Sequence, residues 1–251
     1  RSTRSFINEG RLDAIEKELL PGDVLLIQFG HNDAKLEDPT RYTNPDSDYQ
    51  QFLSRYIAAA RAKGATPILI TPVARLLYDF GALLDTHGRY TQAMKHVASE
   101  QNVQLIDLNA SSMAWIRALG EQGAKPYFMF VPEQNKADGT HFSAAGATAV
   151  ACLVMRGWVD IAPQLKPTLK RDIDCGAISV GQGVTPSTPS AAAPAVATPK
   201  QDVTNPHGSQ VIREQDIGRQ QPGPHGGAGP TTAYSFFAEV SDLPFVMRKR
   251  V

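Results

Sequence analysis

Two short stretches of the sequence carry side chains that could do chemistry together. The first, "DGTHFSAAG" at 138–146, places Asp138 three residues before His141, where a helix is predicted to begin. The second, "LIQFGHND" at 26–33, ends an apolar run in Gly-His-Asn-Asp and offers the side-chain amide of Asn32. An imidazole oriented by a carboxylate is a general base for a serine or water nucleophile, and an amide donor can stabilise an oxyanion. The two stretches together supply three of the parts that acyl transfer needs.

Each motif also has an ordinary structural interpretation. An Asp-x-x-His pair before a helix commonly caps the helix and leaves a surface histidine. Asn-Asp after a strand is common turn chemistry. His31 could ligate a metal, but no second His or Cys stands near it at ligand spacing, which favours packing in a turn. The catalytic interpretation therefore rests on the motifs occurring together in one chain.

Apolar runs and amphipathic stretches alternate along the first part of the chain. Three runs rich in Ile, Leu and Val have the pattern of buried parallel strands, at 24–30, 66–73 and 103–109. Helical periodicity appears at 11–20, 46–63 and 88–101, and Ser143 can cap a helix that runs to about Arg156. This alternation predicts an α/β fold, with a parallel sheet covered by helices on both faces. "GHND" then follows a strand at its carboxyl end, where such sheets bind ligands, and "DGTH" is expected on a loop before the last helix.

The composition changes along the chain and predicts three parts. Residues 1–165 form the α/β domain. Residues 166–208 are rich in Pro, Ala, Ser and Thr and are predicted to be an extended linker, since they offer little apolar surface to bury. Residues 209–251 regain apolar residues and are expected to be the start of a second domain, cut short at Val251.

Charge and cysteine content exclude several classes of protein. The 251 residues hold 25 Lys and Arg against 25 Asp and Glu, so the net charge gives no case for nucleic acid or an anionic membrane surface as partner. No uninterrupted apolar run reaches the ~18 residues of a membrane span. The two cysteines, Cys152 and Cys175, form neither a disulfide framework nor a zinc cluster, and whether they pair stays open.

As a set, five stretches resemble the SGNH (GDSL-type) hydrolases, most closely their rhamnogalacturonan acetylesterase-like branch. They are "RSTRSFINEGR" (1–11), "PGDVLLIQFGHND" (21–33), "KGATPILITPV" (63–73), "DTHGRY" (85–90) and "DGTHFSAAGA" (138–147). The resemblance implies a three-layer α/β/α, flavodoxin-like fold. It assigns the oxyanion-hole side chain to Asn32, the general base to His141 and its orienting carboxylate to Asp138.

The same resemblance implies an activity and a setting. The reaction would be removal of acetyl groups from a pectic, rhamnogalacturonan-like polysaccharide or oligosaccharide through an acyl-serine intermediate. No metal and no organic cofactor is implied. The resemblance and the Pro/Ala/Thr-rich segment suggest a secreted or periplasmic protein.

The sequence departs from the family pattern at its beginning. The family carries its nucleophilic serine in a Gly-Asp-Ser motif on the first strand, and this motif is absent from the chain. Ser2 and Ser5 are not substitutes, because they belong to the segment that follows the family's oxyanion-hole glycine. The resemblance therefore predicts that the nucleophile, that glycine and the first strand of the sheet precede Arg1. By itself, the 251-residue chain is then expected to be inactive and prone to aggregation.

Two alternatives to an acetylesterase remain open at this point. One is a carbohydrate-binding relative that lacks the serine altogether. The other is a metal-binding, cupin-type protein in which the first domain is a scaffold, because the C-terminal stretch faintly resembles the lead-in to a cupin barrel. His207 and His225 are better explained as loop residues than as ligands, so metal content of the full-length protein would distinguish this alternative.

Overall fold

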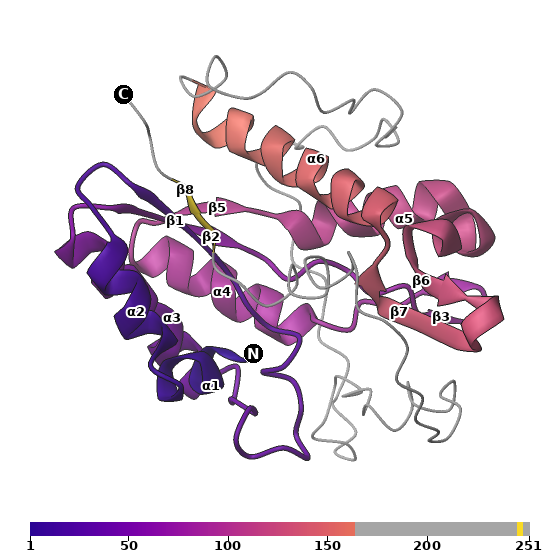
Figure 1. Ribbon diagram of the computed structural model, residues 1–251, viewed down its shortest axis with the longest axis horizontal. Helices are drawn as coiled ribbons and strands as arrows, with labels where there is room; N and C mark the ends of the chain where they lie inside the picture. The colour runs from indigo at the N-terminus through magenta and orange to yellow at the C-terminus, as the bar shows by residue number, and fades with distance from the viewer. Residues whose placement is uncertain (164–244, 248–251) are drawn as a thin grey trace, which may run out of the picture.

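The sheet lies at the centre of the molecule (Figure 1). In this computed structural model the described residues are 1–163 and the backbone of 245–247. The strand order is β5-β2-β1-β8, in which β1 (Val24–Gln28), β2 (Thr66–Ile70) and β5 (Gln104–Ile106) run parallel. The last strand, β8 (Phe245–Met247), pairs antiparallel with the other edge of β1. The predicted parallel α/β sheet is confirmed, and its antiparallel edge strand was not predicted.

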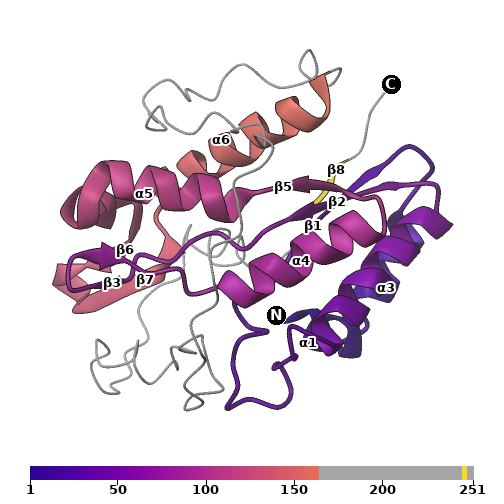
Figure 2. The same cartoon turned by 180° about the vertical axis from the view of Figure 1, so that it is seen from behind.

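Helices cover both faces of the sheet (Figures 1 and 2). One layer holds α1 (Thr3–Asn8), α2 (Arg11–Glu18), α3 (Asp48–Ala62) and α4 (Gly88–Glu100), and the other holds α5 (Leu108–Ala124) and α6 (Ala144–Ile161). Two further pairs of strands lie beside the main sheet: β3 (Tyr78–Asp79) with β4 (Ala82–Leu83), and β6 (Phe128–Val131) with β7 (Lys136–Phe142). Short 3-10 turns at Lys125–Tyr127 and Pro132–Gln134 flank β6. The result is the three-layer arrangement that the sequence predicted.

Alternation along the strands explains why both faces are apolar. Leu25 and Ile27 of β1 join the core cluster under α1 to α4, whereas Leu26 joins the cluster under α5 and α6. On β2, Leu69 faces the first cluster and Ile68 faces the second. Successive strand side chains point to opposite faces, so only a run of apolar residues can fill both cores.

The predicted helices are present, with shifts at their ends. The apolar stripe of α3 is buried except Phe52, which lies half-buried beneath the Arg4 guanidinium. Helix α6 starts at the predicted cap, where Ser143 accepts a hydrogen bond from the Gly146 amide, but it runs to Ile161 rather than to about Arg156. The extra turn buries Trp158, which accounts for the longer helix.

The end of the chain is described only in part. Most of the predicted linker and of the predicted second domain, including His207 and His225, lies outside the described residues, so these domain boundaries stay predictions. Cys152 is buried in α6 and is disulfide-bonded, while Cys175 lies outside the described range. Within residues 1–163 one helix, α6, is long and apolar enough to span a membrane, a test that the core helix of a globular domain also passes.

Candidate active site

The "DGTH" motif lies on β7 rather than on a free loop, which corrects the expectation from sequence. Met129 of β6 pairs with Asp138, and the next residue back, Phe128, pairs with Phe142, so 139–141 bulge out of the ladder. Within this bulge one carboxylate oxygen of Asp138 accepts hydrogen bonds from the backbone N–H groups of Thr140 (2.8 Å) and His141 (3.0 Å). Bulges redirect side chains at active sites, and this one turns His141 outward.

Asp138 and His141 form the hydrogen-bonded pair that their spacing predicted. The second carboxylate oxygen, Oδ2, lies 2.7 Å from Nδ1 of the imidazole. Burial raises the pKa of Asp138, but the hydrogen bonds from the His141 ring and from backbone amides outweigh it and lower the pKa to about 2. The carboxylate therefore stays ionised and favours the tautomer with its proton on Nδ1, which leaves the basic lone pair on Nε2. The His141 side chain is 52% exposed, so its ring is open to solvent.

Gly30 and a buried carboxylate fix the "GHND" loop after β1. Gly30 has φ of 143°, and a Cβ there would lie 2.4 Å from the Pro72 ring, so only glycine fits this close approach. Asp33 is fully buried and accepts hydrogen bonds from the backbone and hydroxyl of Thr3 and from the hydroxyl of Thr43. Burial raises the pKa of Asp33 to about 6 despite these bonds. Asp33 thus ties the N-terminal segment to the loop that carries Asn32.

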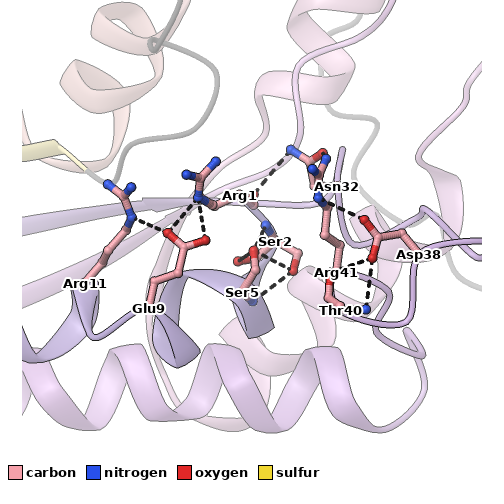
Figure 3. A network of polar contacts seen from close by, with 9 residues as sticks. All are labelled: Arg1, Ser2, Ser5, Glu9, Arg11, Asn32, Asp38, Thr40 and Arg41. Carbon is pink, nitrogen blue, oxygen red and sulfur yellow. Dashed lines mark hydrogen bonds and ion pairs between the residues drawn. The ribbon is translucent and has the colours of Figure 1, made fainter.

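The Asn32 side chain lies beside the first residue of the chain (Figure 3). Its amide nitrogen is 3.5 Å from the Arg1 carbonyl oxygen, and its amide oxygen accepts a hydrogen bond of 3.3 Å from Arg41. Ser2 and Ser5 form the capping box of α1 and are buried there, where their hydroxyls bind one another and the backbone. These serines therefore cap α1, and the expectation that neither is the nucleophile stays a prediction.

One backbone segment after β2 joins the two motif loops. The Arg75 guanidinium donates to the His31 carbonyl oxygen (3.3 Å), and the next residue, Leu76, donates its N–H to the carbonyl oxygen of Gly139 (2.8 Å). A Cβ on Gly139 would lie 2.4 Å from the Leu76 carbonyl oxygen, so the two backbones are in direct contact. Sequence reasoning missed Arg75 and Leu76, because they follow the end of a predicted strand and belong to no motif.

His31 packs against a second buried imidazole. Its ring centroid lies 4.2 Å from that of His87 in "DTHGRY", a residue to which sequence reasoning gave no role. Burial, then the Arg75 charge and His141, lower the pKa of His31 well below its usual value, so it stays neutral. The expectation that His31 packs in a turn agrees with this burial, and residues 1–163 hold no group of three or more His, Cys, Asp or Glu placed to bind a metal ion.

Contacts between loops connect the segments that carry the three predicted site residues. Asp138 and His141 are in direct contact, and His141 is near enough to His31, the neighbour of Asn32, to influence its pKa. The bridge through Arg75 and Leu76 connects the two loops. Whether the Asn32 amide and the His141 ring face one substrate therefore stays a prediction.

Comparison with known proteins assigns the chain to a family. The GDSL-like Lipase/Acylhydrolase family matches residues 2–149, and the chain belongs to this family of ester hydrolases. Two relatives come from Bacillus subtilis (strain 168). The probable rhamnogalacturonan acetylesterase YesY is 48% identical over 157 residues, which cover 62% of this chain and 71% of that protein. Rhamnogalacturonan acetylesterase RhgT is 43% identical over 176 residues, 67% of this chain and 74% of that protein.

A solved structure supports the fold. The crystal structure of YxiM from Bacillus subtilis superposes with a TM-score of 0.53 at 29% sequence identity and covers 64% of this chain and 43% of that one. The predicted resemblance to SGNH (GDSL-type) hydrolases and to their rhamnogalacturonan acetylesterase-like branch is thereby confirmed.

Proposed function

We propose that the protein removes acetyl groups from a rhamnogalacturonan-like, pectic polysaccharide. His141 acts as the general base, Asp138 orients it, and the side-chain amide of Asn32 donates to the oxyanion. The nucleophile is the serine that the family carries in a Gly-Asp-Ser segment, a motif that does not occur within residues 1–251. The two relatives named as rhamnogalacturonan acetylesterases support the choice of substrate.

The chemistry follows from where the donor and the base lie. Nε2 of His141 takes the proton of the serine hydroxyl as its oxygen attacks the acetyl carbonyl carbon, and negative charge develops on the carbonyl oxygen. The Asn32 amide stabilises that charge, and the imidazolium then returns its proton to the departing sugar oxygen. Water, activated by the same imidazole, releases acetate and restores the serine. The anionic carboxylate of Asp138 stabilises the imidazolium in both steps.

A single observation carries the proposal: the hydrogen bond of 2.7 Å between Asp138 and the Nδ1 atom of an exposed His141. A capping aspartate would bind only backbone amides, whereas here one oxygen binds the backbone and the other binds the ring. Such a division of one carboxylate between a turn and an imidazole is what an orienting residue needs.

The test is release of acetate from acetylated rhamnogalacturonan by the full-length protein. We expect His141→Ala to lower kcat by at least ~10³-fold and leave the thermal midpoint near that of the wild type, because the ring is exposed. His96→Ala, which removes a histidine from the exposed side of α4, is the matched control and should leave kcat unchanged. Equal activity of the wild type and His141→Ala would refute the assignment.

We also propose that the protein is secreted or periplasmic, because plant cell-wall polysaccharide lies outside the cell that degrades it. Fractionation of cells that express the full-length gene, followed by detection in culture medium or periplasm, tests this. Retention in the cytoplasm would contradict it.

A further inference from the structure

The hairpin of β3 and β4 holds an aromatic residue in an unfavourable conformation. Tyr78 pairs with Leu83 and Asp79 with Ala82, so the turn consists of Phe80 and Gly81. Both turn residues have positive φ, 44° for Phe80 and 80° for Gly81. Two-residue hairpin turns of this kind favour Asn-Gly or Asp-Gly, and a bulky residue at positive φ is an outlier. The second turn position has the expected residue and the first does not.

Burial in the core does not explain the strained conformation of Phe80. Its relative exposure is 103%, against 56% for Leu20 and 50% for Leu36, the other exposed large apolar residues in the described part of the chain. The ring therefore gains no burial while the backbone bears the strain of a left-handed conformation. When no packing contact offsets the strain of a residue, that strain is grounds for inferring a function.

The hairpin begins beside the candidate active site. Leu76, whose N–H binds Gly139 within the "DGTH" bulge, leads directly into β3. Phe80 is four positions after Leu76, so the tip lies at most ~13 Å along the strand from that contact. The base of the hairpin is fixed, because Leu83 is buried in the core and the Tyr78 hydroxyl lies 3.5 Å from the Ile116 carbonyl oxygen of α5. The hairpin is thus held at its base, and its tip carries the exposed Phe80 ring.

We propose that Phe80 is a distal subsite for the polysaccharide, and that its ring stacks on a sugar of the chain whose acetyl ester lies at His141. This inference rests on the proposed function and adds a residue to its substrate binding. An uncharged aromatic face suits the C–H face of a pyranose. The residues around Phe80 are also exposed: Asp79 is acidic, and Gly81 and Ala82 are small. One ring on a narrow turn offers far less than the ~800 Å² that a protein partner needs, but it matches the area of a sugar.

Affinity measured without turnover tests the subsite. Acetylated rhamnogalacturonan oligosaccharides of increasing length are titrated calorimetrically into the full-length protein carrying His141→Ala. Adding Phe80→Ala should weaken binding of long oligosaccharides roughly 3- to 10-fold and should leave binding of a disaccharide unchanged. Phe80→Trp should retain the affinity, and Leu20→Ala, which removes another exposed apolar side chain, should match its parent.

A second variant separates binding from folding. Asn tolerates positive φ, so Phe80→Asn should lose affinity for long oligosaccharides while the thermal midpoint stays the same or rises. A midpoint that falls together with the affinity would give Phe80 a structural role and overturn the proposal. Equal affinity of the wild-type residue and Phe80→Ala for every length would also overturn it, while the acetylesterase assignment would stand on its own kinetic test. A shift from dimer to monomer in Phe80→Ala would show that the ring contacts a second copy and would likewise overturn it.

Discussion

Replacing Gly139 by alanine tests whether contact between two backbones sets the position of His141. A Cβ at this position would lie 2.4 Å from the carbonyl oxygen of Leu76, and it must retreat by about 1 Å to reach an ordinary contact near 3.4 Å. The bond of 2.8 Å from the Leu76 N–H to Gly139 lies at the same place and would stretch as the bulge moves. Because His141 is two residues further on, the displacement passes to the imidazole.

The size of the effect follows from that displacement. A misplacement of ~1 Å in a catalytic group costs about 10²-fold in rate, so we expect kcat for acetate release to fall by that order with little change in KM. The lost hydrogen bond and the overpacking should together lower the free energy of unfolding by about 1–3 kcal/mol. That loss corresponds to a thermal midpoint lower by roughly 3–10 °C.

The assay is kcat and KM for acetylated rhamnogalacturonan with the full-length protein, together with thermal unfolding. Gly123→Ala is the matched control, because its Cβ would meet only Leu119 at an ordinary 3.6 Å inside α5. The control should keep full activity and the same or a higher midpoint, since alanine favours a helix. Wild-type kcat in Gly139→Ala would refute the idea that the contact between Leu76 and Gly139 positions the base.

Three further predictions concern stability and its dependence on pH. The pKa of Asp138 is lowered to about 2, so its carboxylate stabilises the folded state fully above its unfolded pKa of ~3.9. Asp138→Asn should reduce the free energy of unfolding in urea by at most ~2 kcal/mol at pH 7, and the reduction should shrink below pH 4 and vanish as the pH falls through about 2. The pKa of Asp33 is raised to about 6, so the folded state holds the extra proton and wild-type stability should fall as the pH rises from 4 to 6, a slope that Asp33→Asn should remove. The Tyr90 hydroxyl donates to the carbonyl oxygens of Asp33 and Thr43, so Tyr90→Phe should cost about 1–3 kcal/mol in the same assay, and an unchanged midpoint would show that these acceptors find other donors.

The sequence predicted the parts of the fold that follow from periodicity. The three parallel strands and helices α2, α3, α4 and α6 were found because apolar residues recur at the period of each element. Helix α5 was missed: it contains Gly120, where φ is 70° and the helix kinks, so no single apolar stripe runs through it. The strand β8 was also missed, because pairing with β1 joins residues more than 200 positions apart and leaves no local signal.

The candidate site likewise has features that were predictable from the sequence and features that were not. The contact between Asp138 and His141 was predictable because both residues lie within one short turn. The roles of Arg75, Leu76 and His87 were not predictable, because each depends on contacts between loops that meet only in the folded chain. The exposure of Phe80 was not predictable, because no sequence pattern marks a bulky side chain that adopts positive φ in a turn.

The most direct test of the central claim is the rate at which the full-length protein releases acetate from acetylated rhamnogalacturonan. This rate is compared with that of the His141→Ala variant, after thermal unfolding has shown that the two proteins have the same midpoint. We predict that the wild type releases acetate and that the variant loses at least ~10³-fold in kcat. A wild type that releases no acetate, or a variant with wild-type kcat, would contradict the account.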